Sequence, residues 1–329
     1  MALVAVGISG CGGGGETTEV AETRTEVTET HPAPPELLVS LDSLEGPQNI
    51  GLLMADQRGY FEDVGLDVSV ANPLEQNRPV SYVAKGTDDF ALAQQPQVAI
   101  AKEKGMPIVA VGSVIPHPTD AMIWLKRSKI DGIADLKGKT IAVPGIPYQE
   151  RMLWNLLAEA GLSRGDVQVE SVAYEVVSKL LDGSADAIFG VSWNLEGAEL
   201  ESLGLEPVIT RVKDLGAPDY EQLVVIAPTE MVADNPEVVR DFMSAMARGT
   251  EAAVGHPEAA VKAIVKAPGP DLAQTRKAME AQVRATLPLL STSGYMDPDR
   301  AEGLVEWMDE EGLIESRPPA SSLFTNDFH

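Results

Sequence analysis

AIFGVSWNLEG, residues 187–197, changes from apolar to polar in its middle. Its first part, 187–191, is too short for a helix and is typical of a buried strand, whereas the polar part begins at Asn194. Ligands of open α/β sheets bind outside the carboxyl ends of strands, so we expect Trp193, Asn194 and Glu196 at such an edge. They offer a stacking ring, an amide and a carboxylate to a flat, donor-rich small molecule. These residues alone leave open a core tryptophan followed by a solvated helix.

Strands and helices are predicted to alternate on both sides of this stretch, which indicates parallel sheets covered by helices on both faces. We expect a first lobe from residues 37–120 plus 224–329 and a second lobe from residues 121–223. The predicted strands are one that ends at Asp42 and those at 66–71, 90–93, 108–113, 121–126, 139–143, 167–172, 187–191 and 223–227. The predicted helices are 51–63, 75–84, 97–104, 238–254, 258–266, 272–286 and 300–311. Crossings near Ala121 and Leu223 would form a two-stranded hinge.

The first 36 residues are expected to lie outside the folded body. Residues 1–11 end in Ile8-Ser9-Gly10-Cys11, the small-residue pattern before the lipidated cysteine of bacterial lipoproteins, and Cys11 is the single cysteine of the chain. Residues 12–36 are rich in Gly, Thr, Glu and Pro, with little to bury, and predict a disordered tether. We therefore expect lipidation of Cys11 and an extracytoplasmic protein that contacts the membrane through this anchor alone.

The composition restricts the partners. The 329 residues carry a formal net charge of −25, which disfavours nucleic acid, an anionic membrane surface and, more weakly, an anionic ligand. His117 is the one histidine near a plausible cleft, and one histidine without cysteines makes no metal cage. Residues 190–194 lack the second glycine of a nucleophile elbow. We expect no catalytic residue, no metal and no cofactor, and a monomeric protein.

Six segments resemble one known family, the substrate-binding lipoproteins of ABC importers that take up pyrimidine precursors of thiamine, related to the yeast pyrimidine synthase. The similarity covers most of residues 37–313. The segments are RGYFEDVGLDV (58–68), AQQPQ (93–97), DLKGKTIAVPGIPYQE (135–150), GVSWNLEG (190–197), LGAPDYEQLV (215–224) and GYMDP (294–298). The resemblance implies a periplasmic-binding-protein fold (type II), in which two α/β lobes close on a small heterocyclic ligand, and an ABC permease as partner.

One segment departs from the family pattern. Pyrimidine binders have Asp-Trp-x-Pro-Asn followed by a histidine after the first strand, whereas this chain keeps Asp42 but has Ser43 and Asn49 at the tryptophan and histidine positions. A different or larger heterocycle, such as riboflavin, therefore stays an alternative ligand, as does a small sulfonate. An enzyme of thiamine pyrimidine synthesis is a third hypothesis, opposed by the absence of a cysteine-rich iron motif.

The aminopyrimidine hypothesis assigns roles to nine residues. Glu196 would accept from an exocyclic amine and a ring N–H, and Trp193 would stack on the ring, with Tyr148 or Tyr220 on its other face. Gly145 lies in a turn before a helix, where free N–H groups could bind a polar oxygen, although shaping the turn is the alternative role. The other expected ligand contacts are Asn194 and, from the first lobe, Asp42, Gln94 and Gln95.

Overall fold

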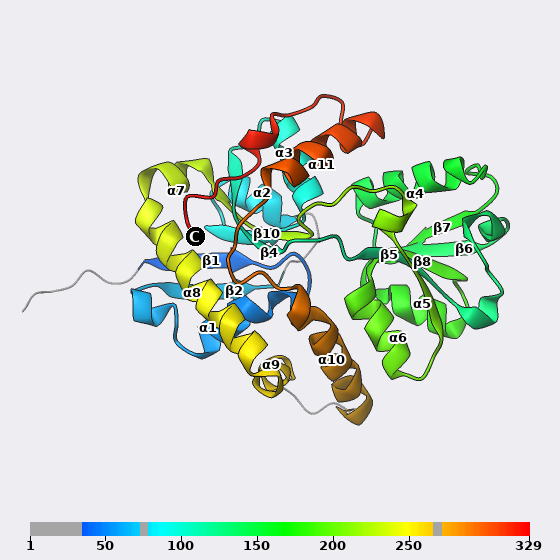
Figure 1. Ribbon diagram of the computed structural model, residues 1–329, viewed down its shortest axis with the longest axis horizontal. Coiled ribbons are helices and arrows are strands. Elements are labelled where there is room, and N and C mark those ends of the chain that lie inside the picture. Colours follow the sequence, from blue (N-terminus) through cyan, green and yellow to red (C-terminus); the bar gives the residue numbers. More distant parts are fainter. Residues whose placement is uncertain (1–34, 73–77, 266–271) are drawn as a thin grey trace, which may run out of the picture. The chain divides into compact units, whose positions relative to one another are not determined.

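The computed structural model describes residues 35–72, 78–265 and 272–329. These residues form two five-stranded sheets with helices packed against them (Figure 1). Residues 34–329 belong to one compact unit. Cys11 and residues 12–34 of the predicted tether lie outside the described residues, whereas Glu36, the last residue of that predicted segment, belongs to the first strand of the fold. We call the elements around the first sheet the first lobe and those around the second sheet the second lobe.

The first sheet has the strand order β2-β1-β3-β10-β4. Its strands are β1 (Glu36–Ser40), β2 (Asp67–Ala71), β3 (Phe90–Ala93), β4 (Ile108–Ile115) and β10 (Leu223–Pro228). β1 pairs in parallel with β2 and β3, with Val39 opposite Val70, while β10 runs antiparallel to β3 and β4. Val224 and Val225 of β10 enter different cores, because successive side chains of a strand point to opposite faces. The sheet is therefore buried on both faces.

The second sheet has the order β7-β6-β8-β5-β9. Its strands are β5 (Asp120–Leu125), β6 (Thr140–Val143), β7 (Gln168–Ser171), β8 (Ala187–Ser192) and β9 (Pro207–Arg211). β6 is parallel to β7 and β8, whereas β5 is antiparallel to β8 and β9. Met122 and Ile123 of β5 lie in the cores on opposite faces of this sheet. The stretch 187–191, on which the sequence analysis rests, is thus a strand with two neighbours.

Helices cover both faces of the first sheet. α1 (Ile50–Gln57) and α8 (Pro236–Gly255) cover one face, and α2 (Arg78–Ala84), α3 (Gln95–Glu103) and α11 (Pro298–Glu310) cover the other (Figure 1). α1 and α8 approach closely at Gly249, where a Cβ would lie 2.1 Å from the carbonyl oxygen of Gly51. A side chain at residue 249 would therefore force these two helices apart. The remaining helices of this lobe are α7 (Thr229–Asp234), α9 (Pro257–Ile264) and α10 (Leu272–Thr286).

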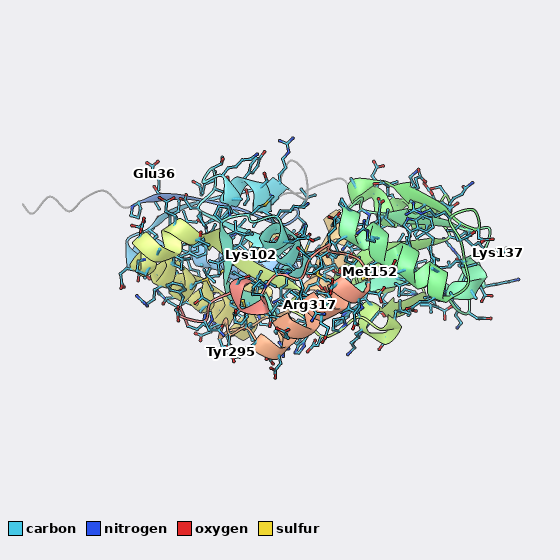
Figure 2. The ribbon with its side chains drawn as sticks, turned by 90° about the horizontal axis from the view of Figure 1, so that it is seen from above. Glu36, Lys102, Lys137, Met152, Tyr295 and Arg317 are labelled. Carbon is cyan, nitrogen blue, oxygen red and sulfur yellow. The ribbon has the colours of Figure 1, made fainter. Side chains whose placement is uncertain are left out.

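The second sheet is covered by α4 (Pro147–Glu159) on one face and by α5 (Val176–Asp182) and α6 (Ala198–Ser202) on the other. Met152 of α4 is buried in this lobe, whereas Tyr295 of the first lobe points into solvent (Figure 2). A π-helical turn, Trp193–Gly197, joins β8 to α6. The short 3₁₀ turns are Pro47–Asn49, Glu62–Val64, Lys126–Ser128, Ile133–Leu136, Ala173–Glu175, Val212–Leu215, Leu287–Leu289 and Ala320–Ser322. Among the described helices, none combines the length and the apolarity that a membrane crossing requires.

Three expectations need correction. The sheets are mixed and not parallel, because β5 and β10 are the crossing strands and each enters its new sheet antiparallel to its neighbours. β9 was not predicted; it begins with Pro207, which an edge strand tolerates because one side of its backbone needs no ladder partner. The helix expected at 51–63 ends at Gln57, since the left-handed backbone at Gly59 (φ 69°) interrupts it. The part of the predicted helix 75–84 before residue 78 lies outside the described residues, as does Lys266 at the end of predicted helix 258–266.

Candidate functional site

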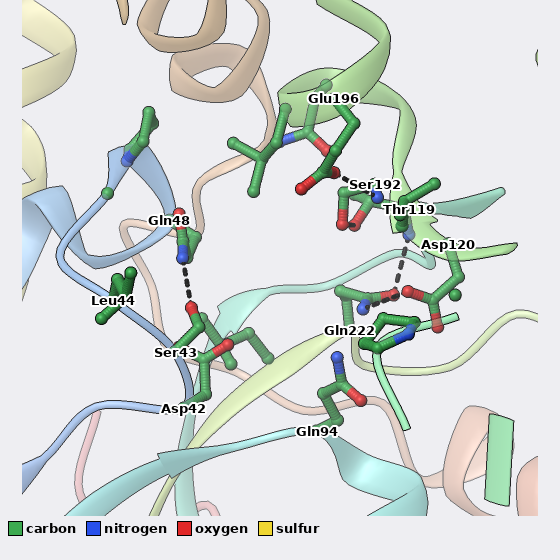
Figure 3. Close-up of a pocket in the computed structure, with 18 of the residues that line it drawn as sticks. Asp42, Ser43, Leu44, Gln48, Gln94, Thr119, Asp120, Ser192, Glu196 and Gln222 are labelled. Atoms are coloured by element: carbon green, nitrogen blue, oxygen red, sulfur yellow. Dashed lines mark hydrogen bonds between the residues drawn. The ribbon is translucent and has the colours of Figure 1, made fainter. Parts of the chain in front are cut away.

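A cavity of about 320 Å³ lies between the two lobes (Figure 3). Its volume is at the low end of the roughly 300–1,000 Å³ of small-molecule pockets. The first lobe contributes the loop 42–48 after β1, together with Gln94 and helix α10, and the second lobe contributes the end of β8 and the turn after it. The lining is completed by the two segments that connect the lobes: the first crossing, residues 116–119 before β5, and the second crossing, residues 216–222 before β10. A ligand in this cavity would therefore contact both lobes and the hinge.

The lining is acidic. It includes the carboxyl groups of Asp42, Glu45, Asp120 and Glu196, and among the described residues that line it there is no lysine, arginine, histidine or aromatic side chain. Apolar surface comes from aliphatic side chains, including Ile115, Ile146, Val191 and Leu195. Such a site favours a cation or a molecule rich in hydrogen-bond donors, and it repels anions.

Glu196 lies in the π-helical turn directly after β8 and faces the cavity (Figure 3). Its Oε2 accepts a hydrogen bond of 2.7 Å from the backbone N–H of Ser192, which fixes the side chain. Burial raises the pKa of Glu196 to about 7, and the negative charges of Glu199 and Asp120 act in the same direction. A positively charged ligand would reverse this shift and would be held by the ionised carboxylate.

Asp120, which begins β5, is 1% exposed and forms part of the cavity floor. Its Oδ1 accepts a hydrogen bond of 3.1 Å from the Gln222 amide, and its Oδ2 accepts one of 3.3 Å from the Tyr220 hydroxyl. Gln222 also accepts from the Thr119 backbone N–H at 2.8 Å, so the two crossings are joined here. Burial raises the pKa of Asp120 to about 6, against the lowering effect of these hydrogen bonds.

The loop after β1 forms one wall of the cavity and carries Ser43, where the sequence resemblance implies a tryptophan in pyrimidine binders. Asp42 accepts a hydrogen bond of 3.1 Å from Asn49, and burial raises the pKa of Asp42. Ser43 accepts one of 2.6 Å from the Gln48 side chain (Figure 3). Ser43 and Gln48 both line the cavity. At position 43 this wall therefore presents a hydroxyl group and no aromatic ring.

Four of the nine predicted ligand residues line the cavity: Asp42, Gln94, Asn194 and Glu196. Asn194 is 1% exposed and donates a hydrogen bond of 2.8 Å to Thr286 Oγ1, which ties the second lobe to α10. Gln94 caps α3 and accepts a hydrogen bond from the hydroxyl of Tyr148 in the second lobe. These two contacts hold the lobes together across the cavity.

The other five predicted residues are not among those that line the cavity. Trp193 is half-buried and lies against Arg211, whose guanidinium carbon is 4.2 Å from the centre of its ring. Gln95 is buried and accepts from the Glu221 backbone N–H at 2.9 Å, and Tyr220 is buried beside Asp120. Their direct contact with ligand stays a prediction without support from this arrangement.

Tyr148 and Gly145 shape the second-lobe side of the site. Tyr148 is 5% exposed and its hydroxyl donates to Gln94, so in this arrangement it joins the two lobes beside the cavity, and its stacking on a ligand stays a prediction. Gly145 has φ 86°, and a Cβ there would lie 2.3 Å from Ser171 Oγ. The turn therefore needs glycine for its backbone conformation, which favours the turn-shaping role over oxygen binding.

Several lining residues were not predicted, among them Asp120, Gln222, Gln48, Met279 and Gln282. Asp120 and Gln222 have a sequence signal, because each is a polar residue next to one of the two predicted crossings. Met279 and Gln282 have none, since helical periodicity does not reveal which face of α10 meets the second lobe. Gln282 donates to the Leu195 carbonyl oxygen at 3.3 Å. Within the described residues, no cluster of His, Cys, Asp and Glu could hold a metal ion.

Comparison with known proteins confirms the predicted fold and family. The model of the NMT1/THI5-like family matches residues 46–260. The formylaminopyrimidine-binding protein of Halalkalibacterium halodurans is 29% identical over 295 residues, covering 88% of this chain and 89% of that protein. The 4-amino-5-hydroxymethyl-2-methylpyrimidine phosphate synthase of Candida albicans is 26% identical over 225 residues, covering 65% and 66%.

Solved structures show the same architecture. The alkanesulfonate-binding protein SsuA of Xanthomonas axonopodis pv. citri, bound to MOPS, superposes with a TM-score of 0.68 at 17% identity, covering 89% of this chain and 99% of that one. This likeness establishes the periplasmic-binding-protein fold, while the match over 46–260 establishes the relationship by descent. The chain belongs to the NMT1/THI5-like family.

Proposed function

We propose that this chain is the extracytoplasmic substrate-binding protein of an ABC importer and that it captures an aminopyrimidine precursor of thiamine. The observation that carries the proposal is the carboxyl group of Glu196, which faces a small cavity lined by three further carboxyl groups, with no cation among the described lining residues. The similarity to a formylaminopyrimidine-binding protein over most of both chains supports binding over catalysis.

The chemistry of an aminopyrimidine matches this lining. Its exocyclic amine and a protonated ring nitrogen form a pair of donors on one edge, which the carboxylate of Glu196 can accept. Charge-assisted hydrogen bonds of this kind contribute roughly 1.5–3 kcal/mol each. The aliphatic side chains of Ile115, Ile146, Val191 and Leu195 supply apolar contact for the ring faces. Stacking on Trp193 is not needed in this arrangement.

The alternative ligands fit less well. A sulfonate would meet four carboxyl groups and no positive charge among the described lining residues, in contrast to what an anion site requires. Riboflavin has three fused rings and a long polyol chain, which a cavity of about 320 Å³ accommodates only with further separation of the lobes. The loss of the tryptophan at Ser43 still makes riboflavin the competitor to include in any binding test.

Delivery would follow from closure of the lobes. The contacts Tyr148–Gln94 and Asn194–Thr286 already join the lobes directly in this structure and would hold them together around a bound ligand. A permease that recognises this closed arrangement reads occupancy without contacting the ligand. Lipidation of Cys11 would keep the monomeric protein at the membrane near its permease.

Isothermal titration of the full chain tests the proposal, with 4-amino-5-hydroxymethyl-2-methylpyrimidine, riboflavin and an alkanesulfonate as ligands. The wild-type protein should prefer the pyrimidine, and Glu196→Gln should weaken that binding about tenfold to a hundredfold, because one charge-assisted pair is lost. Glu201→Gln, an exposed change on α6, is the matched control and should leave the affinity unchanged. Preferential binding of riboflavin or the sulfonate, or full affinity in Glu196→Gln, would contradict the proposal.

A further inference from the structure

Asp120 is the carboxyl group that connects the cavity to the hinge. It lies at the first residue of β5, directly after the first crossing, and it lines the cavity. It accepts hydrogen bonds from Tyr220 and Gln222 of the second crossing, and the Gln149 side chain of α4 also interacts with its carboxyl group. A change at Asp120 therefore acts on both connections between the lobes.

The surroundings of Asp120 are not those of a structural ion pair. It is 1% exposed, yet none of the ion pairs found in the described residues includes it. The side chains that interact with it are neutral: the amides of Gln222 and Gln149 and the hydroxyl of Tyr220. A buried carboxylate without a cation is destabilising, and such groups are concentrated at binding and catalytic sites. Elsewhere in the hinge, Glu221 is equally buried but is paired with Arg300 at 3.2 Å.

Asp120 also retains free acceptor capacity on the cavity side. An ionised carboxylate has about four lone-pair positions; the hydrogen bonds from Gln222 and Tyr220 occupy two of them, and Gln149 interacts with the group from α4. At least one position is left for a further donor, and the cavity lies beside the carboxyl group (Figure 3). A donor of a bound molecule could therefore be received without breaking either bond.

Asp120 and Glu196 influence each other. The charge of Asp120 contributes to the raised pKa of Glu196, so the two carboxyl groups lie close enough to repel one another. Ser192 and Thr119 lie between them, joined by a hydrogen bond of 3.1 Å between their hydroxyl oxygens. A molecule with two separate donor groups would satisfy both carboxyl groups and relieve the repulsion, whereas a molecule with one donor edge would serve only one of them.

We propose that Asp120 is a second ligand-binding carboxyl group, which receives the donor on the polar substituent of the ring while Glu196 receives the amine edge. This inference rests on the proposed function, because it takes the ligand to be a small donor-rich ring. It names the ligand class more narrowly, as rings with a second N–H or O–H donor beside the amine. Because Tyr220 and Gln222 of the second crossing donate to Asp120, a ligand bound to Asp120 also restricts the motion of the hinge.

A ligand pair tests the assignment: 4-amino-5-hydroxymethyl-2-methylpyrimidine and 4-amino-2,5-dimethylpyrimidine, which lacks the hydroxyl donor. Titrated against the full wild-type chain, the first should bind about tenfold more tightly than the second. In Asp120→Asn this preference should fall below about threefold, while in Glu196→Gln it should persist although both ligands bind more weakly. If Asp120→Asn does not fold, Asp120→Ser takes its place.

The hinge part of the proposal has its own readout. Hydrogen exchange of segments 116–120 and 219–223 should slow on saturation of the wild-type protein with the hydroxymethyl ligand, and it should slow less in saturated Asp120→Asn. Tyr220→Phe removes the hydroxyl that links Asp120 to the second crossing, so these segments should also slow less on saturation of this variant than in wild type. Equal slowing in wild type and Asp120→Asn would overturn the coupling.

Failure of this inference is distinguishable from failure of the proposed function. If the wild-type protein binds both pyrimidines but Asp120→Asn keeps the full preference for the hydroxyl, the assignment of Asp120 is wrong and pyrimidine binding stands. If neither pyrimidine binds, the proposed function fails, and acetamidinium, a small cation with two N–H edges, replaces them as probe. Weaker acetamidinium binding by Asp120→Asn than by wild type then supports Asp120 as a ligand contact, and unchanged or absent binding overturns it.

Discussion

At the scale of the residue, three carboxyl groups determine the electrostatics of the cavity. Burial raises the pKa of Asp42, Asp120 and Glu196, and the described cavity lining offers no cation to offset it. Each group is thus destabilising when ionised in the empty protein. A bound cation or donor-rich ligand compensates for this cost, which is how a binding site can select its ligand at the expense of stability.

The pKa of Asp120 makes stability depend on pH in a defined direction. The pKa of Asp120 is about 6 in the folded protein and 3.8 in its ordinary state, so the folded protein binds the proton more tightly than the unfolded chain does. This proton binding stabilises the fold fully below pH 4, and the stabilisation is lost as the pH rises through 6. Asp120→Asn prevents this loss of stability, because asparagine stays uncharged at every pH. Relative to wild type, the variant should therefore gain stability between pH 4 and pH 7, by up to about 3 kcal/mol.

Urea unfolding of the ligand-free full chain at pH 4, 5, 6 and 7 measures this gain. Glu302→Gln is the control, because Glu302 is exposed on α11 and does not line the cavity. A gain for Asp120→Asn that is as large at pH 4 as at pH 7 would show that the substitution acts through packing and not through titration.

At this scale the sequence predicts part of the site. Asn194 and Glu196 line the cavity as expected, because they follow a buried strand and strand ends meet at one edge of a sheet. Trp193 does not, since the π-helical turn sets the direction of its ring toward Arg211, and strand periodicity cannot show where the next turn begins. Asp120 is missed because its significance depends on which residues of the second crossing lie beside it.

At the scale of the element, Arg300 of helix α11 contacts both segments of the hinge. Its Nη1 donates to the Pro116 carbonyl oxygen at 2.9 Å and to Glu221 Oε1 at 3.2 Å, while its Nε pairs with Asp219 Oδ2 at 3.0 Å. Pro116 belongs to the first crossing, and Asp219 and Glu221 belong to the second. Glu221 is completely buried, and burial raises its pKa even beside this guanidinium. One arginine thus holds both crossings in a single arrangement.

Arg300→Gln should destabilise the protein by about 3 kcal/mol, because it leaves the buried carboxyl group of Glu221 without its cation. Arg317→Gln is the matched control on the same side of the first lobe. Its ion pairs with Glu306 and Asp309 are exposed and should contribute less than about 1 kcal/mol. The free energy of unfolding in urea checks both values; equal effects of the two substitutions would refute the role of Arg300 in the hinge.

Most elements could be predicted from the sequence because their apolar residues repeat with a clear period. β8 and β10 are buried runs bounded by polar residues, and α8 has an apolar face of residues such as Val239, Phe242 and Met246. The direction of β5 and β10 within their sheets could not be predicted, since it depends on the path between lobes. β9 could not be distinguished from a loop because it is short and starts with proline.

At the scale of the whole molecule, charge and cavity agree about the ligand. The chain carries a formal net charge of −25, and the described part of its cavity is lined by carboxyl groups without a cation. The fold itself is shared with an alkanesulfonate-binding protein and does not decide the ligand. The proposed selection of a cationic or donor-rich ring would therefore rest on the lining residues at the end of β8, in the turn after it and in the two crossings.

The most direct test of the central claim is a crystal structure of the full chain with 4-amino-5-hydroxymethyl-2-methylpyrimidine. We expect the ring between the lobes, with its amine edge within hydrogen-bond distance of Glu196, its hydroxyl beside Asp120 and aliphatic side chains against its faces. A ligand seated elsewhere, or seated in the cavity with its donors turned away from both carboxyl groups, would contradict this account.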